Sequence, residues 1–262
     1  MSWFKSIDEL LYSDYRTRDW PMMSTTAYPT LISLVYVFFI KVIGPKYMTN
    51  KKPYKLRKIL MVYNIGQILA CTYLSISFLK TNPKFGCDPL DLSNDPMSIH
   101  IASLVWWTKL LKLTEYIETV FFVLRKKQNQ ISALHIYHHV STYMIIWMST
   151  RINPGGVVRI PVILNCFVHM MMYFYYLLSS LGPKIQKKIE FYKKYITIIQ
   201  MVQFCIIIVN SLFFFAPDCN VPNIYGYVFI PNVFLVFYMF YDFYNNAYSE
   251  KGAHDIKNRK QK

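Results

Sequence analysis

Charged residues are scarce in this sequence, and acidic residues are the scarcest. They make up 16% of the 262 positions, against about 25% in an average soluble domain, and 14 Asp and Glu stand against 29 Lys and Arg. Glycine occurs only eight times, and no Asn-x-Ser/Thr acceptor for N-glycosylation is present. Apolar residues instead reach 54% and aromatic residues 18%. This composition excludes a disordered, collagen-like or disulfide-dense chain and is typical of a polytopic membrane protein.

The N-terminus lacks the apolar core of a signal peptide, because six charged residues are spread over positions 8–19. Internal repeats of 20–50 residues and low-complexity segments are also missing. We therefore predict one membrane domain over residues 1–262, with an N-terminal segment 1–27 and a polar tail 249–262. The first apolar run then serves as the insertion signal.

Seven apolar runs are candidates for membrane spans. They cover residues 28–43, 59–79, 99–124, 131–149, 157–181, 195–215 and 225–248. The third and fourth runs contain polar residues, so we expect them to face a protein interior rather than lipid. The predicted fold class is an all-α integral membrane protein with seven transmembrane helices.

Lys and Arg gather in alternate loops between these runs. Segments 44–58, 125–130, 182–195 and 249–262 hold 19 basic residues, whereas 1–27, 80–98, 150–156 and 216–224 hold six. By the positive-inside rule the first set is cytosolic, which places the N-terminus in the lumen and the C-terminus in the cytosol. The net charge of +15 is thus a matter of topology, and we expect no nucleic-acid partner.

Two of the five cysteines, Cys87 and Cys219, lie in loops predicted to be lumenal. Because the lumen is oxidising, we predict a disulfide between them, the alternative being two free thiols. The tail ends Arg-Lys-Gln-Lys at 259–262, which resembles a dilysine retrieval signal of the endoplasmic reticulum. A solvated basic tail is the alternative interpretation.

Histidines lie inside two consecutive apolar runs, where ionisable groups are costly and are functional candidates by default. His135, His138 and His139 are spaced i, i+3 and i+4, so one helix face carries all three imidazoles. Three histidines on one face argue against a purely structural role. With His169 in the next run, they form the predicted catalytic set.

Further polar residues in these and the neighbouring runs are predicted to support the histidines. Lys112 and Glu115 are spaced i, i+3 and can pair in low dielectric, although such a pair can also simply fix helix packing. For the two tyrosines, packing is at least as good an explanation as function. The supporting set is Lys112, Glu115, Glu118, Asn165, Tyr173, Tyr176, Gln200 and Gln203.

Two kinds of chemistry suit such a site. Membrane oxidases bind metal through many histidines, but here His100 and His254 lie outside the core and four remain in it. A single metal with His and Glu ligands stays an alternative. Acyl chemistry is the other kind, because a neutral imidazole is a competent nucleophile or base. We favour histidine as the reactive group, with no metal or cofactor, over a Cys166–His169 pair.

Two further classes of function fit the sequence less well. The short lumenal loops and the core rich in His and amides argue against a seven-helix receptor. The apolar and aromatic lumenal ends of the runs argue against a transporter or channel, which needs a continuous polar path.

At these positions the sequence resembles the ELO family of very-long-chain fatty acid elongases. Residues 135–139 are similar to the family's HxxHH box, 169–176 to its HxxMYxYY box and 197–203 to its TxxQxxQ box. Residues 112–119 resemble its KxxExxDT box, except that Glu118 stands where the family usually has Asp. Four boxes in order on predicted spans make the resemblance specific, and it covers nearly the whole chain.

The resemblance implies six helices in an inverted barrel around a narrow acyl tunnel, in the endoplasmic reticulum membrane. It implies condensation of a long-chain acyl-CoA with malonyl-CoA to a 3-ketoacyl-CoA, with His138 as the expected nucleophile. A condensation without a covalent intermediate and a metal-dependent lipid oxidase remain alternatives. The expected partners are the ketoacyl-CoA reductase, dehydratase and enoyl-CoA reductase of the same cycle, and a homodimer or heterodimer is compatible with it.

Basic residues in the cytosolic loops are expected to attract the phosphates of CoA. They are Arg125, Lys126, Lys127, Lys187 and Lys188. Positive-inside topology alone also explains such residues.

Overall fold

The computed structural model describes residues 14–216, 219 and 221–248, and all regular secondary structure within them is helical. A first segment joins α2 (Ala27–Phe38), a π-helical turn (Phe39–Ile43) and α3 (Gly44–Met48). The other long helices are α4 (Arg57–Leu79), α5 (Pro96–Leu124), α6 (Ala133–Ile152), α7 (Arg159–Ser180), α9 (Tyr192–Ser211) and α10 (Asn223–Tyr248). Short helical pieces are Gln128–Gln130, Gly156–Val158, α8 (Pro183–Ile189) and Leu212–Phe215.

Five segments in the described part are long and apolar enough to cross a membrane. They are Ala27–Met48, Arg57–Leu79, Gly156–Ser180, Tyr192–Phe215 and Asn223–Tyr248. The helices α5 and α6 are similar in length but carry four charged residues and three histidines, respectively. Each predicted apolar run thus lies mainly within a helix, and the protein is an all-helical multi-pass membrane protein.

The first segment is longer than the sequence predicts. The run 28–43 was expected to end before Gly44 and Pro45, but helical structure continues to Met48. Pro45 occupies the first turn of α3, where a missing N–H is tolerated, and the π-helical turn before it absorbs the change in hydrogen bonding. The apolar run 28–43 thus lies within a longer helical segment.

The two most polar long helices begin at side-chain caps. Asp95 Oδ2 accepts a hydrogen bond from the Met97 N–H at 2.9 Å, with Pro96 in the first turn of α5. Ser132 Oγ accepts one from the His135 N–H at 3.1 Å at the start of α6. These caps fix where the helices begin, and with them the register of the polar residues that they carry.

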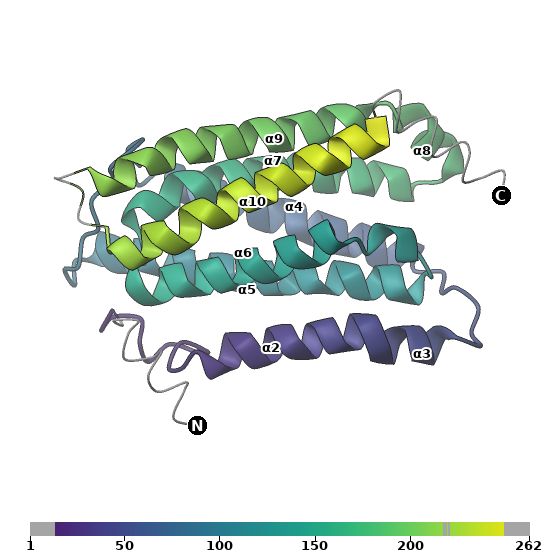
Figure 1. The fold of residues 1–262 in the computed structure, drawn as a ribbon, viewed down its shortest axis with the longest axis horizontal. Coiled ribbons are helices and arrows are strands. Elements are labelled where there is room, and N and C mark those ends of the chain that lie inside the picture. Colours follow the sequence, from purple (N-terminus) through teal and green to yellow (C-terminus); the bar gives the residue numbers. More distant parts are fainter. Residues whose placement is uncertain (1–13, 217–218, 220, 249–262) are drawn as a thin grey trace.

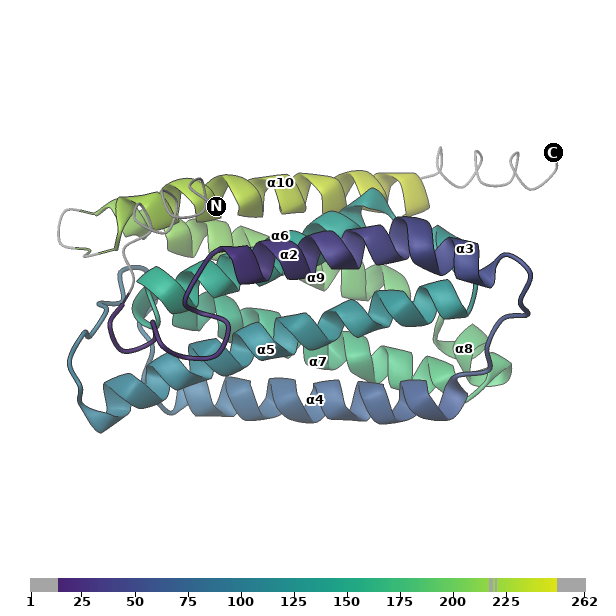
Figure 2. The same ribbon diagram turned by 90° about the horizontal axis from the view of Figure 1, so that it is seen from below.

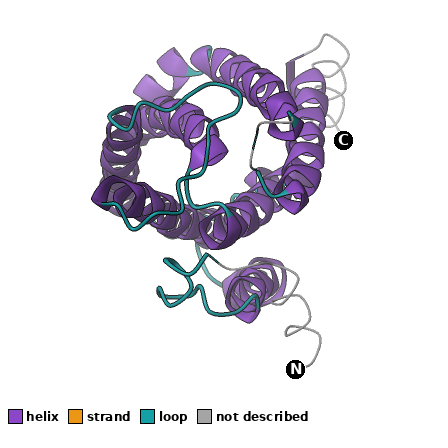
Figure 3. Ribbon diagram, turned by 90° about the vertical axis from the view of Figure 1, so that its left-hand side faces the viewer, coloured by secondary structure: helices purple, strands orange, loops and turns teal. Residues whose placement is uncertain are grey.

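Six long helices pack in a closed order. The helix α4 packs along α7, α7 on α9, α9 on α10, α10 on α6, α6 on α5, and α5 back on α4. Figure 3 shows the arrangement end-on, with the helix nearest the N-terminus lying outside the ring. That helix, α2, packs on α6, while α3 and the π-helical turn pack on α5 (Figures 1 and 2).

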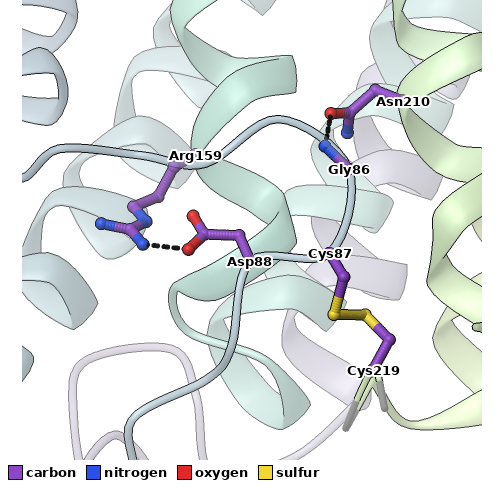
Figure 4. Close-up of a disulfide and its surroundings, with 6 residues drawn as sticks. All are labelled: Gly86, Cys87, Asp88, Arg159, Asn210 and Cys219. Atoms are coloured by element: carbon purple, nitrogen blue, oxygen red, sulfur yellow. Dashed lines mark hydrogen bonds and ion pairs between the residues drawn. A yellow bond between two sulfur atoms is a disulfide. The ribbon is translucent and has the colours of Figure 1, made fainter. Parts of the chain in front are cut away.

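One end of the ring, called here the disulfide end, is closed by loops. A disulfide joins Cys87 to Cys219, the pair that the sequence predicts (Figure 4). Beside it the Gly86 N–H donates to Asn210 Oδ1 at 2.8 Å. These links tie the connection after α4 to the ends of α9 and α10.

A buried ion pair strengthens the same connection. Arg159, at the start of α7, pairs with Asp88 and donates to the carbonyl oxygen of Thr81 at 2.8 Å (Figure 4). Gly156 has a φ of +50° and lies so close to this loop that a Cβ there would be 2.7 Å from the Asp88 carbonyl oxygen. The loop therefore packs against the backbone before α7.

The described part of the N-terminal segment also lies at the disulfide end. Asp14 and Arg16 form a buried ion pair with a distance of 2.7 Å, and Arg16 donates to the Asp91 carbonyl oxygen at 2.7 Å and to Ser98. The Ser93 N–H donates to Asp91 Oδ1, which lowers the pKa of that carboxyl. Residues 1–13 lie outside the described ranges.

The opposite end, called here the basic end, carries α3, α8 and the turn between α5 and α6 (Figure 1). Three of the four basic segments predicted from the sequence, 44–58, 125–130 and 182–195, belong to this end. The fourth, tail 249–262 with its predicted retrieval signal, lies outside the described residues.

Candidate active site

A cavity lies among α5, α6, α7, α9 and α10. Its wall is mostly apolar, with polar side chains at particular positions. The polar lining residues are Thr108, Lys112, His138, Thr142, Ser149, Asn165, Gln203, Tyr225 and Asn232. The apolar ones are Ile145, Ile146, Val158, Pro161, Val162, Phe204, Ile207, Phe229, Val233 and Val236.

The cavity runs along the helices toward the disulfide end. On α6 its wall extends from His138 to Ser149, which corresponds to roughly 16 Å of helix. Lys112, Asn165 and Gln203 lie beside the His138 part, whereas Val158 and Tyr225 lie near the helix ends at the disulfide end. The lining thus combines a polar site at mid-depth with a long, mainly apolar recess.

The four predicted histidines lie close together. The ring centroids of His138 and His169 are 6.4 Å apart, those of His138 and His139 5.9 Å, and those of His135 and His139 4.3 Å. Of the four, His138 is the one on the cavity wall. Helical spacing alone does not rank His138 above its neighbours, whereas the structure distinguishes it by its place.

Glu115 lies at the centre of this cluster and is fully buried. Its Oε1 accepts a hydrogen bond from Lys112 Nζ at 2.7 Å and lies 3.2 Å from His169 Nδ1. Its Oε2 lies 4.0 Å from His139 Nδ1. One carboxylate on α5 thus faces a cation on its own helix and one imidazole on each of α6 and α7, and it lies close enough to His169 to orient that ring.

The fourth histidine has different partners. His135 Nε2 lies 2.8 Å from Thr119 Oγ1, and Thr119 Oγ1 lies 2.7 Å from the hydroxyl of Tyr36. Phe122 packs near the His135 ring, with centroids 5.4 Å apart. Tyr36 was not among the residues predicted from the sequence, although Ser33 and Tyr36 form a polar pair spaced i, i+3 in a mostly apolar run, which was a usable signal.

The supporting residues fall into two groups. Lys112, Glu115, Asn165, Gln203 and Tyr173 contact the histidines or line the cavity, with the Tyr173 ring 5.8 Å from the ring of His169. The others lie further out: Tyr176 packs on Tyr173 at 6.2 Å, Gln200 Nε2 lies 3.8 Å from Met172 Sδ, and Glu118 is buried with no ion pair among the described residues.

Several polar atoms at the site are buried without a hydrogen-bond partner among the described residues. They include His138 Nδ1, Asn165 Oδ1 and the Tyr173 hydroxyl. Unpaired polar atoms in an interior are costly and call for an explanation.

Sequence reasoning did not single out Thr142 and Asn232 on the cavity wall. Thr142 follows His138 by four positions, and its hydroxyl donates to the His138 carbonyl oxygen at 2.6 Å. Asn232 Oδ1 accepts a hydrogen bond from the Tyr137 hydroxyl at 2.9 Å. The spacing of four positions from His138 could have identified Thr142. The place of Asn232 on the cavity wall depends on how α10 packs on α6, which the sequence does not show.

The predicted CoA-binding residues lie away from the cavity lining, at the basic end. Lys126, Lys127, Lys187 and Lys188 are exposed, and Arg125 is half-buried. Lys126 Nζ donates to the Thr49 carbonyl oxygen at 3.3 Å. Their charge therefore faces solvent at the basic end. The polar part of the cavity lies nearer to this end than the apolar recess does.

The alternative chemistries gain no geometric support. Within the described ranges, no group of three or more His, Cys, Asp or Glu side chains is placed to hold a metal ion. His100 is exposed near the start of α5, and His254 lies outside the described residues. Cys166 is buried and is not among the residues of the described cavity wall.

The fold and the site together define a class: multi-pass helical membrane proteins with a mainly apolar cavity beside a cluster of buried histidines. Sequence comparison then gives the family. The profile described as ELO: GNS1/SUR4 family matches residues 21–256, so the chain belongs to the ELO family.

Curated relatives agree with this assignment. The chain is 40% identical over 249 residues to very long chain fatty acid elongase 7 of Drosophila melanogaster, covering 93% of this chain and 75% of that protein. It is 35% identical over 243 residues to very long chain fatty acid elongase 4 of Mus musculus, covering 91% and 77%. It is 34% identical over 249 residues to elongase 1 of the mouse, covering 91% and 88%.

Proposed function

We propose that this protein is a very-long-chain fatty acid elongase, a condensing acyltransferase. It joins a long-chain acyl-CoA to malonyl-CoA, forms a 3-ketoacyl-CoA two carbons longer, and releases CO₂ and CoA. Membership of the ELO family and the names of its relatives support this assignment. The observation that carries it is the position of His138 on the wall of the cavity, where the polar site meets the apolar recess.

The apolar recess suits the acyl chain. Each CH₂ group that leaves water for an apolar wall is stabilised by about 0.8 kcal/mol. The recess is lined by Ile, Val and Phe side chains from four helices and extends toward the disulfide end. A chain held there places its thioester beside His138, and the CoA moiety then points toward the basic end.

The proposed reaction has two stages. The His138 imidazole attacks the thioester carbonyl carbon, the C–S bond breaks, and CoA leaves, so that an acyl-imidazole forms. Malonyl-CoA then loses CO₂, and its carbanion attacks the acyl carbon and frees His138. Because decarboxylation generates the carbanion, no strong base is required.

The neighbouring residues have supporting roles in this scheme. His169 stabilises an oxyanion or places the malonyl group, and Glu115 orients it from 3.2 Å. His135 and His139 keep the reactive ring in place, while Asn165 and Gln203 offer hydrogen bonds from the cavity wall. Gln200 acts from further out, through the packing of α9 on α7. A direct condensation on the same residues, without the acyl-imidazole, is the competing mechanism.

The topology follows from the same proposal. All seven long helical segments cross the membrane, and six of them form an inverted barrel around the acyl tunnel. The disulfide end with Cys87 and Cys219 faces the lumen of the endoplasmic reticulum, because disulfides persist in oxidising compartments. The basic end faces the cytosol, where CoA substrates and the enzymes of the cycle meet it.

The partners are those of the elongation cycle. Arg125, Lys126, Lys127, Lys187 and Lys188 attract the CoA phosphates at the basic end. A ketoacyl-CoA reductase, a dehydratase and an enoyl-CoA reductase consume the product in turn, and a homodimer or heterodimer is compatible with this cycle. The condensation itself requires no cofactor besides the two CoA substrates.

A condensation assay tests the proposal. Membranes that contain the wild type, His138→Ala or His100→Ala receive malonyl-CoA and a panel of acyl-CoAs without NADPH, and mass spectrometry detects 3-ketoacyl-CoA. We expect product from the wild type and from His100→Ala, because His100 is exposed and remote from the cavity. We expect none from well-expressed His138→Ala. A folded wild type that forms no product from any acyl-CoA would refute the proposal.

A further inference from the structure

The helix α2 lies outside the ring, yet it turns polar side chains inward. Ser33 and Tyr36 are each only 6% exposed, whereas their neighbours Leu34 and Val35 are 59% and 66% exposed. In a membrane helix the apolar side chains face lipid, and polar ones face protein partners. The inward face of α2 therefore carries specific contacts, and these contacts show what the helix does for the rest of the molecule.

Both polar side chains reach α5. Ser33 Oγ lies 3.1 Å from the Tyr116 hydroxyl, and the Tyr36 hydroxyl lies 2.7 Å from Thr119 Oγ1. The rings of Tyr36 and Tyr116 stack at a centroid distance of 4.0 Å. The two hydrogen bonds are one helical turn apart on the same interface. The Tyr36 one continues through a further hydrogen bond to a histidine, whereas Tyr116 meets His139 only by an edge-on ring contact at 6.4 Å.

The Tyr36 contact extends across three helices. Thr119 is fully buried on α5, and its Oγ1 lies 2.8 Å from His135 Nε2 on α6. A continuous line of hydroxyl, hydroxyl and imidazole thus joins the outer helix to the histidine cluster. Beyond it, the His135 ring packs on the ring of His139, whose Nδ1 faces Glu115.

The direction of these hydrogen bonds follows from counting protons. Among the described residues, Thr119 is the sole hydrogen-bond partner of the Tyr36 hydroxyl. To use its proton, the buried Tyr36 must donate to Thr119, and Thr119 must then donate to His135 Nε2. The opposite direction leaves a buried phenol proton unpaired, which is costly. The satisfied arrangement makes Nε2 of a neutral His135 an acceptor and puts its proton on Nδ1.

We propose that Tyr36 and Thr119 are positioning residues of the active site. They hold His135 in its Nδ1–H tautomer and hold its ring against His139, which in turn keeps the Glu115 and His138 side chains in register. This inference rests on the proposed condensation reaction for its catalytic consequence. The peripheral helix is then part of the catalytic apparatus, although it contributes no residue to the described cavity wall.

Four variants test the catalytic consequence in the condensation assay. Thr119→Val removes the hydroxyl at nearly constant volume, and we expect kcat to fall about tenfold at unchanged KM for acyl-CoA and with an altered pH profile. Thr119→Ser restores the hydroxyl and should restore the rate. Tyr36→Phe should lower kcat severalfold. Ser33→Ala breaks the neighbouring contact between α2 and α5, and is the matched control with wild-type kcat per folded molecule.

A second measurement is independent of activity. Nuclear magnetic resonance of ¹⁵N-histidine-labelled protein in lipid nanodiscs reports imidazole tautomers, with the His135 signal assigned by its loss in His135→Gln. We expect an Nδ1–H tautomer in the wild type and in Ser33→Ala, and a mixture in Thr119→Val. An Nε2–H tautomer in the wild type, or equal loss of kcat in Ser33→Ala and Tyr36→Phe, would overturn the inference. A wild type without condensation activity would refute the proposed function instead. The His135 tautomer would still show whether the hydrogen bonds run from Tyr36 through Thr119 to His135.

Discussion

At the scale of single residues, Glu115 is the point on which the candidate site depends. It is fully buried and is held by Lys112 on its own helix, and it faces His169 and His139 on two others. A buried carboxylate is tolerated only when it is paired, so the cation is as necessary as the anion. The same carboxylate lies 3.2 Å from His169 Nδ1, so the pair that stabilises the bundle also belongs to the candidate site.

Breaking this pair from the lysine side should strongly destabilise the protein. Lys112→Met removes the ammonium group that lies 2.7 Å from Glu115 Oε1 and leaves the buried carboxylate without a cation. We expect a loss of about 3–5 kcal/mol in the free energy of unfolding. The double variant Lys112→Met/Glu115→Gln removes the uncompensated charge and should recover part of that loss. Lys126→Met, at an exposed position, is the control with little effect.

Denaturant titration in detergent micelles measures these differences. A double variant as unstable as Lys112→Met alone would contradict the assignment of Glu115 as the charge that Lys112 compensates. A full loss in Lys126→Met would show that the assay reports net charge rather than the buried pair.

Sequence periodicity predicted the composition of the site better than its internal order. The spacing i, i+3, i+4 placed His135, His138 and His139 on one face, and the structure brings them together with His169. Which ring borders the cavity depends on how α9 and α10 pack beside α6, and no local pattern contains that information. The same holds for Thr119, because its hydrogen bond to His135 joins α5 to α6.

At the scale of helices, the apolar runs predicted the elements, although the first helical segment is longer than its run. This segment accommodates Gly44 and Pro45 with a π-helical turn and continues to Met48. Asp95 and Ser132 are ordinary N-cap residues, and they do mark where α5 and α6 begin. A cap adds a hydrogen bond at one place, whereas a helix can tolerate glycine and proline when the neighbouring turns adjust.

The start of α7 supplies a test at this scale. Gly156 adopts a φ of +50°, and a Cβ there would meet the Asp88 carbonyl oxygen at 2.7 Å. We expect Gly156→Ala to destabilise the protein by at least about 1–2 kcal/mol, because a left-handed conformation is costly with a side chain and the loop must also move. Gly66→Ala is the matched control, since a Cβ there meets nothing within 4 Å.

Thermal unfolding of the two purified variants measures the difference. Gly66 lies inside α4, where alanine favours the helix, so its variant should be as stable as the wild type or slightly more stable. Equal stability of Gly156→Ala and the wild type would show that the loop before α7 is not tightly held by Asp88.

At the scale of the whole molecule, two independent asymmetries coincide. The described parts of the loops predicted to be lumenal gather at the end that carries the disulfide, and the three basic segments that the structure describes gather at the other (Figure 1). The sequence predicted this separation because charge and cysteine distributions are visible along the chain. It did not predict the order α4, α7, α9, α10, α6, α5 around the ring, which depends on tertiary packing, so only family resemblance pointed to a barrel.

The ring order explains why the site needs residues from several boxes. The helices α5, α6 and α7 supply Glu115, His138 and His169, and α9 and α10 complete the cavity wall. The helix α2 lies outside the ring but reaches the site through Tyr36. A change in any one of these helices can therefore alter the geometry at His138, which makes the whole bundle the unit of function.

The most direct measurement follows the acyl group itself. Purified protein is incubated with a long-chain acyl-CoA alone, its intact mass is recorded, and peptides are mapped before and after malonyl-CoA is added. We predict an acyl adduct on His138 that disappears on addition of malonyl-CoA as 3-ketoacyl-CoA forms, and no adduct in His138→Ala. Product formed at full rate with no adduct at any time, or an adduct on another residue, would show that His138 is not the acyl carrier.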